Sequence, residues 1–200
     1  MSRSIAQRLR DAAESLSTER VSVATLADAH GPALHGSLLL LMAVPSLLPV
    51  PGAGTVMGLG IAALALAMLQ GRDDAPLPRR VAELEMSQRW ARRVLGLMAS
   101  LYGLAERCSR ERMAHLAPDR PGAWLALVLA VMALILVLPI PFGNILPALA
   151  VAVIGLGLAF RDGLVVALGT VMAGLTLVLT SAALFAVAVQ LQDWVGGFLS

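Results

Sequence analysis

Long stretches without any charged residue dominate the pattern of this chain. No Asp, Glu, Lys or Arg occurs in residues 29–71, 122–160 or 163–192. The third stretch contains Gly163–Val189, 27 uninterrupted apolar or weakly polar residues, which at about 1.5 Å per residue exceed a hydrocarbon core of about 30 Å. The pattern predicts an all-α integral membrane protein with a C-terminal transmembrane helix.

The first two apolar stretches, Ala33–Gln70 and Ala123–Phe160, share a second pattern. Each is interrupted near its middle by two prolines separated by one residue, and the two pairs lie 90 residues apart: Pro49 and Pro51, Pro139 and Pro141. Such a pair removes two backbone donors and clashes with the preceding turn, so a helix cannot run straight through it. We therefore expect two repeated, Pro-broken helical hairpins, and we also assign Pro147 to the second break.

The halves of the first hairpin are short. Leu34–Leu48 and Gly52–Gln70 have 15 and 19 residues, which reach roughly 22 and 28 Å as helices. A hairpin whose tip lies near the far side of the membrane, or a re-entrant hairpin, fits these lengths better than two ordinary spans. A repeated pair of Pro-interrupted apolar segments is also the pattern that indicates a binding site in transporter-like folds.

The remaining segments are polar or amphipathic. Residues 1–32 form an N-terminal segment in which an amphipathic helix over 4–16 is expected, either at the cytoplasmic interface or packed on the membrane domain of residues 33–200. Repeat 1 covers about 33–114 and repeat 2 about 123–192. A helix from about 88 to 114 is expected, with a short apolar centre. If it crosses the membrane the repeats are inverted, and if it lies flat they run parallel. The placement of the arginines favours a helix that lies flat and therefore parallel repeats. The precedent of paired broken hairpins in other folds favours inverted repeats.

Composition supports the membrane class and excludes several functions. Hydrophobic residues make up 58% of the 200 residues and charged residues 14%, too much apolar surface for one soluble core. One cysteine, Cys108, and three scattered histidines suggest neither a disulfide framework nor a metal site, and no cofactor motif occurs. Neither a catalytic triad, a pair of carboxylates nor a Gly-rich phosphate loop is visible, so no enzyme class is indicated. No aromatic-rich basic face suggests nucleic acid.

The candidate binding residues lie at the hairpin breaks and at the ends of the apolar stretches. Asn144 follows the second break and either binds a polar head group or caps the next helix. Thr55 has the same two interpretations, and three glycines could let the backbone approach a ligand or allow close helix packing: Gly52, Gly54 and Gly143. Arg72 and Arg161 either form interfacial ion pairs with the next residue or hold a lipid phosphate.

Short motifs in both halves give the chain a family resemblance. The string from Leu138 to Asn144 (Leu-Pro-Ile-Pro-Phe-Gly-Asn), the Leu-Pro-Ala-Leu at 146–149 and the Arg-Asp-Gly at 161–163 resemble the ExoD family of bacterial exopolysaccharide-synthesis membrane proteins. Residues 45–55, 69–72 and 77–80 resemble the first half of that family. The resemblance implies a bacterial inner-membrane, multi-pass protein needed for exopolysaccharide production, and it supplies no catalytic residues.

Together these features predict a transporter-like protein that handles a lipid-linked or anionic precursor of exopolysaccharide. The alternative is a non-catalytic scaffold or regulator of a polysaccharide assembly complex. Membrane lipids are the expected partners, together with a lipid-linked saccharide, a second copy of the chain or an assembly complex.

Overall fold

The computed structural model describes residues 11, 20–22, 35–47, 52–71, 85–108, 116–117, 122–138 and 143–199. Several predicted features lie outside these residues: most of the helix over 4–16, Arg72, and the paired prolines 49, 51, 139 and 141.

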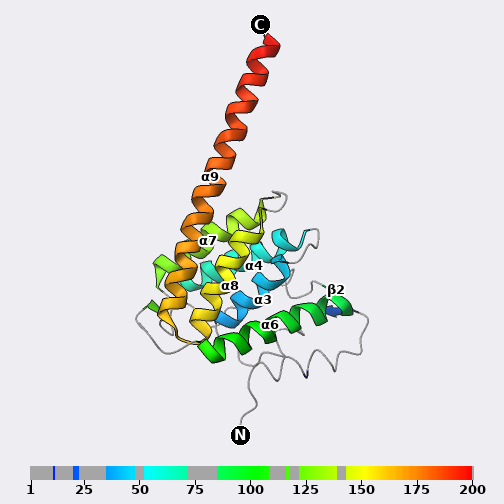
Figure 1. The fold of residues 1–200 in the computed structure, drawn as a ribbon, viewed down its shortest axis with the longest axis vertical. Coiled ribbons are helices and arrows are strands. Elements are labelled where there is room, and N and C mark those ends of the chain that lie inside the picture. The colour runs from blue at the N-terminus through cyan, green and yellow to red at the C-terminus, as the bar shows by residue number, and fades with distance from the viewer. Residues whose placement is uncertain are drawn as a thin grey trace.

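Helices make up nearly all of the described chain (Figure 1). They are α3 (His35–Leu47), α4 (Ala53–Leu69), α6 (Gln88–Cys108), α7 (Ala123–Val137), α8 (Ile145–Ala159) and α9 (Gly163–Leu199). Two three-residue strands, β1 (Arg20–Ser22) and β2 (Glu85–Ser87), form an antiparallel pair in which Arg20 lies opposite Ser87. The all-helical prediction is therefore confirmed apart from this short pair, which was not expected.

The helices stop where the proline pairs predict. α3 ends at Leu47 and α7 at Val137, two residues before the first proline of each pair, and α4 and α8 begin after the second. The assignment of Pro147 as a break is wrong. Pro147 is the third residue of α8, where a backbone N–H would have no helical acceptor, so it is compatible with the first turn.

The two hairpins pack crosswise, α3 against α8 and α4 against α7. A Cβ atom on Gly36, at the start of α3, would lie 2.6 Å from the backbone nitrogen of Ala159, at the end of α8. A Cβ on Gly58, early in α4, would lie 3.1 Å from the carbonyl oxygen of Ala133, late in α7. Both pairs are therefore antiparallel, and both hairpin connections lie at the same end of the bundle, which we call the tip end.

Helix α3 is the centre of the core. Its residues 36–46 are all buried, between α8, α4 and α6. A helix that is apolar all round is stable only when it is covered on every side. The interior Pro45 is tolerated near the C-terminal end of α3, where Ser46 Oγ donates to the carbonyl oxygen of Met42 at 3.2 Å.

Helix α6 crosses the opposite end of the bundle, which we call the base (Figure 1). The Tyr102 hydroxyl donates to Ser37 Oγ at 3.0 Å, and the Tyr102 ring lies 5.7 Å from the ring of Phe160. Since Ser37 begins α3 and Phe160 follows α8, α6 lies where the first hairpin begins and the second ends.

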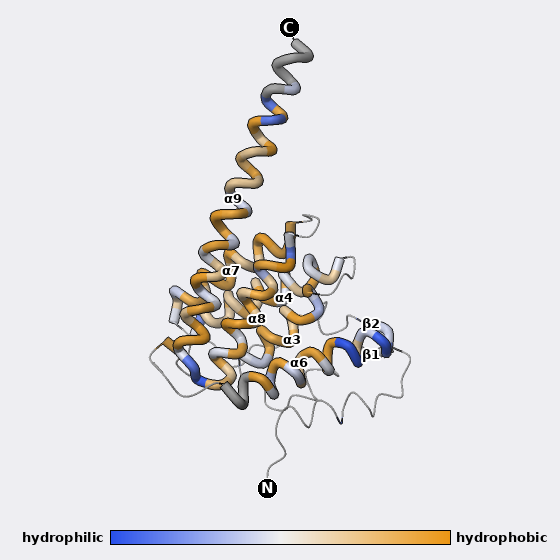
Figure 2. The backbone as a smooth tube through the Cα atoms, viewed as in Figure 1, coloured by the Kyte–Doolittle hydropathy of each residue, from blue (hydrophilic) through white to orange (hydrophobic). Residues whose placement is uncertain are grey.

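Helix α9 starts at the base, packs on α8 and continues past the bundle (Figures 1 and 2). Its residues Gly163–Gln192 are long and apolar enough to cross a membrane, and only 11% of the most apolar window is buried. The predicted C-terminal apolar segment is thus one continuous helix.

The two hairpins end in the same local geometry. Gln70 after α4 and Phe160 after α8 each donate a backbone N–H to the carbonyl four residues earlier, at 3.0 Å in both cases. The next residues, Gly71 and Arg161, both have left-handed backbones with φ of 66° and 54°. These matching positions are 90 residues apart, as the proline pairs are.

Candidate functional site at the hairpin tips

The structure brings Gly54 of α4 and Asn144 of α8 together. They occupy matching positions in the two halves, since 54 and 144 also differ by 90. A Cβ atom on Gly54 would overlap Asn144 Nδ2 and lie 3.0 Å from Asn144 Cγ. It would lie 3.5 Å from the carbonyl oxygen of Leu136, at the end of α7. The absence of a side chain at Gly54 is what lets the Asn144 amide fit between the two tips.

Asn144 occupies the N-cap position of α8, but its side chain does not cap the helix. Its backbone oxygen accepts from the Ala148 N–H at 3.1 Å, whereas the side chain makes no capping hydrogen bond. The interpretation of Asn144 as a side-chain cap is therefore wrong. Its backbone is already helical, with φ −78° and ψ −16°, rather than in the extended conformation typical of an N-cap.

The side-chain oxygen of Asn144 is buried and accepts no hydrogen bond in the described part of the chain. A buried acceptor left without a partner costs about 1–3 kcal/mol, so native proteins rarely retain one without a reason. A donor or a cation supplied by a ligand or by water would satisfy it. This makes Asn144 the strongest binding candidate at the tips.

The other tip candidates have simpler roles. Gly52 is the N-cap residue of α4, with a left-handed φ of 79°, and its carbonyl accepts from the Val56 N–H at 3.1 Å. Thr55 is half-buried in the first turn of α4, and Gly143 lies half-buried in the turn before α8. All three lie beside the Gly54–Asn144 contact along the chain, at the two helix N-termini.

Arg161 is not part of this tip site. It follows α8, so a helix of 15 residues, about 22 Å long, separates it from Asn144. The next residue, Asp162, is 4% exposed and caps α9, since its Oδ1 accepts from the N–H groups of Leu164 and Val165 at 3.1 and 3.4 Å. The predicted site residues therefore divide into a tip group and a base group.

The base also holds polar groups that the sequence did not single out for binding. His35 Nε2 is buried without a hydrogen-bond partner in the described residues. Burial raises the pKa of Tyr102, and the hydrogen bond with Ser37 partly offsets this. Ser37 and Tyr102 are 65 residues apart, so no local pattern could have revealed their contact. Among the described residues, no group of three or more His, Cys, Asp or Glu side chains could hold a metal ion.

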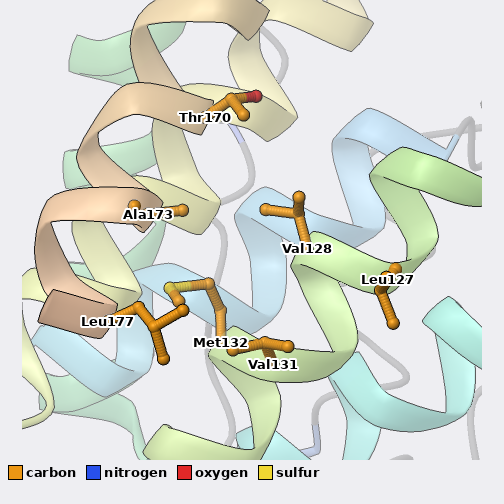
Figure 3. Close-up of a pocket in the computed structure, with 8 residues that line it drawn as sticks. Leu127, Val128, Val131, Met132, Thr170, Ala173 and Leu177 are labelled. Carbon is orange, nitrogen blue, oxygen red and sulfur yellow. The ribbon is translucent and has the colours of Figure 1, made fainter. Parts of the chain in front are cut away.

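An apolar groove of about 240 Å³ lies between α7 and α9 (Figure 3). It is lined by Leu127, Val128, Val131, Met132, Thr170, Ala173, Gly174 and Leu177. Its one hydroxyl group, on Thr170, donates to the Val166 carbonyl at 2.9 Å and so is already satisfied. The groove suits a hydrocarbon chain and offers nothing to a polar ligand.

Comparison with known proteins agrees with the family resemblance of the sequence motifs. The family model described as "Exopolysaccharide synthesis, ExoD" matches residues 5–182. Protein ExoD of Rhizobium meliloti (strain 1021) is 33% identical over 143 residues, which cover 68% of this chain and 59% of that protein. An uncharacterized protein of Synechocystis sp. is 27% identical over 141 residues, 69% of this chain and 66% of that protein. The chain thus spans less than two thirds of the length of either relative. No solved structure matches.

Proposed function

Since the chain belongs to the ExoD family of exopolysaccharide-synthesis proteins, we propose that it supports polymer production as a multi-pass inner-membrane protein of transporter type. The proposed substrate is a lipid-linked or anionic precursor, whose polar part binds at the contact between the hairpin tips. The role is non-enzymatic. The observation that carries the proposal is the buried side-chain oxygen of Asn144, which has no hydrogen-bond partner among the described residues.

The outer surface of the bundle supports a membrane location. Large apolar side chains are exposed on every outer helix, including Leu66 on α4, Leu134 on α7, Ile145 on α8 and Val171 on α9. Apolar patches of this extent are rare on soluble monomers and are typical of surfaces that face lipid. The apolar colour covers the bundle and much of α9 (Figure 2).

We further propose that the hairpins are parallel, re-entrant repeats that enter the membrane from the base. The shared 90-residue offset of the helix ends and left-handed residues supports a repeat. The tips lie at one end and α6 across the other, which favours the flat arrangement of α6 over a crossing one. The hairpin helices have 13 to 17 residues, or about 20–26 Å, less than a hydrocarbon core of about 30 Å.

In this arrangement the tips lie inside the membrane rather than beyond it. A polar group buried at that depth is costly unless it serves binding. Asn144 Oδ1 would accept from a sugar hydroxyl group, and Nδ2 would donate to a sugar or phosphate oxygen. The groove between α7 and α9 would hold the hydrocarbon chain of a lipid-linked precursor. Arg161 would hold a lipid phosphate at the base, because guanidinium grips phosphate with paired hydrogen bonds.

The backbone of Arg161 supports a role for its side chain. A left-handed conformation is unfavourable for a residue with a Cβ, and the matching position in the first half is Gly71. Replacement Arg161→Gly removes this backbone strain, so the variant should remain folded while polymer output falls. Full output from the Arg161→Gly strain would remove this residue from the binding site.

The decisive test is Asn144→Leu. Because the Asn144 oxygen accepts no hydrogen bond from the described residues, the purified variant should remain folded and unfold close to the wild-type temperature. Polymer output in a strain that carries only this variant should be lost. The matched control is Ser181→Ala on α9, which removes an exposed hydroxyl bonded to the Leu177 carbonyl and should leave output unchanged. Normal output from a folded, membrane-inserted Asn144→Leu protein would contradict the tip site and favour the scaffold role.

A further inference from the structure

We propose that the outer face of α6 binds the phosphate groups of anionic phospholipids at the base of the bundle. This proposal rests on the membrane location proposed above, and it is independent of the tip site. It concerns residues that neither the tips nor the groove use.

The two faces of α6 differ sharply. The face toward the bundle is apolar and buried: Ala91, Val94, Leu95, Met98, Ala99 and Tyr102. The opposite face is exposed and carries Arg89, Arg92, Arg93, Leu97, Ser100 and Leu104. The helical spacing places three arginines in the first two turns of this outer face and two leucines further along it.

The position of α6 puts this face at a membrane boundary. Tyr102 contacts Ser37 at the start of α3 and Phe160 just before α9 begins. The segment of α9 that is long enough to span a membrane starts at Gly163, so α6 lies at the level where that span begins. A helix at this level reaches the phosphates of one leaflet.

The exposed side chains match the chemistry of that layer. Guanidinium groups bind phosphate through paired hydrogen bonds, and basic residues are attracted to an anionic membrane surface. Arg93 stacks over the ring of Trp90 at 4.8 Å, which orients the guanidinium next to an aromatic ring typical of membrane interfaces. Leu97 and Leu104 are 41% and 61% exposed, and they would contact the upper part of the acyl chains. A face of this kind fits anionic lipid better than bulk water.

The test uses the full chain purified in a neutral detergent. Thermal unfolding is followed with added phosphatidylglycerol or phosphatidylcholine at equal concentrations, for the wild type and for the triple variant Arg89→Gln, Arg92→Gln, Arg93→Gln. Phosphatidylglycerol should raise the wild-type midpoint by about 2–4 °C or more, the usual response to modest ligand stabilisation in a protein of this size. Phosphatidylcholine should not, and the triple variant should lose the difference between the two lipids.

Two further measurements test whether the response depends on the charge of the arginines. A triple Arg→Lys variant keeps the charge but loses the paired guanidinium hydrogen bonds, so its response should lie between those of the wild type and the triple Gln variant. High salt should abolish the phosphatidylglycerol response of the wild type, because exposed charges are screened. An equal response to both lipids in the wild type, or an undiminished phosphatidylglycerol response in a folded triple Gln variant, would overturn the proposal. Neither result would affect the Asn144→Leu experiment, which tests the tip site by polymer output.

Discussion

At residue 54 a hydrogen atom stands where any other residue would place a Cβ atom against the Asn144 amide. The contact joins matching positions of the two halves, and it fixes the one buried acceptor at the tips that has no partner in the described chain. A glycine here serves close approach rather than backbone freedom, in contrast to Gly52, whose φ of 79° requires the left-handed region.

We therefore expect Gly54→Ala to displace the Asn144 side chain. Because the amide is the end of a short side chain that can rotate, the cost in unfolding free energy should be about 1 kcal/mol, the lower end of the range for overpacking. Polymer output should fall, as we also expect for Asn144→Leu. Gly96→Ala on α6 is the matched control, since a Cβ there meets nothing within 4 Å and should stabilise the helix by about 0.5–1 kcal/mol.

The double variant Gly54→Ala, Asn144→Ala decides whether the contact is direct. Removing the amide makes room for the new methyl group, so the two stability changes should not add. Additive changes in the unfolding midpoint would mean that the two residues do not touch.

Tyr102 gives a second prediction at this scale, through its pKa. Burial raises that pKa in the folded protein, so the folded state binds the phenolic proton more tightly than the unfolded state does. Its contribution to stability is present in full below the unfolded pKa of about 10, and it is lost as the pH rises through the higher folded pKa. The midpoint difference between wild type and Tyr102→Phe should therefore shrink as the pH rises above about 10.

Below that range the difference reports the hydrogen bond to Ser37, worth about 0.5–1.5 kcal/mol. A midpoint difference that stays constant up to pH 12 would show that Tyr102 does not titrate with folding.

At the scale of single elements, the start of α9 depends on one carboxylate. Asp162 Oδ1 accepts from two N–H groups of the first turn, and Asp162 is buried against the end of α8. We expect Asp162→Ala to lower the unfolding free energy by about 0.5–2 kcal/mol, the usual cost of losing an N-cap. Asp162→Asn keeps a capping oxygen and should lose less than half of that. Equal midpoints for the Ala and Asn variants would indicate that the cap contributes nothing.

The sequence was most informative about elements whose limits are set locally. A proline lacks the donor that a helix needs, so the ends of α3 and α7 could be placed from Pro49 and Pro139 alone. The cap assigned to Asn144 failed because residue preference does not show whether the amide is drawn towards another helix. The left-handed backbone of Arg161 could not be predicted from the sequence either, because the Arg-Asp pair suggested only a charge contact.

Contacts between segments far apart in the chain were harder to predict from the sequence. The pairing of α3 with α8 and of α4 with α7 follows from how two apolar hairpins cover each other, which no local periodicity encodes. The strand pair joins residues 20–22 to 85–87, and three residues are too few for an alternating pattern. The contact between Gly54 and Asn144 depends on this pairing. The sequence could therefore identify the candidate residues of the site, but it could not predict that they meet.

At the scale of the whole molecule, the two ends of the bundle differ in chemistry. The base carries the arginines of α6, together with Arg161, whereas the hairpin tips point the other way, along α9. Arginine-rich segments next to membrane spans remain on the cytoplasmic side. We therefore expect the base in the cytoplasm, the tips within the membrane and the far end of α9 outside.

Cysteine labelling in intact cells tests this orientation. In a Cys108→Ser background, one new cysteine is placed at exposed Ser100 on the outer face of α6 or at exposed Gln192 near the end of the α9 span. The two sites are separated by an apolar segment of 30 residues, about 45 Å long as a helix, so a membrane-impermeant maleimide should distinguish them. We expect Gln192→Cys to react in intact cells and Ser100→Cys only after lysis.

Each alternative result has a defined meaning. Reaction of Ser100→Cys in intact cells would place α6 outside, and the arginines would then face the wrong leaflet for the proposed orientation. Reaction of both sites only after lysis would mean that α9 does not cross the membrane. If the expected pattern holds, both hairpins enter from the cytoplasmic side, and a precursor reaching Asn144 from that side would need to pass only the far part of the bilayer. That asymmetry separates parallel re-entrant hairpins from inverted repeats, in which a site is reached equally from both sides.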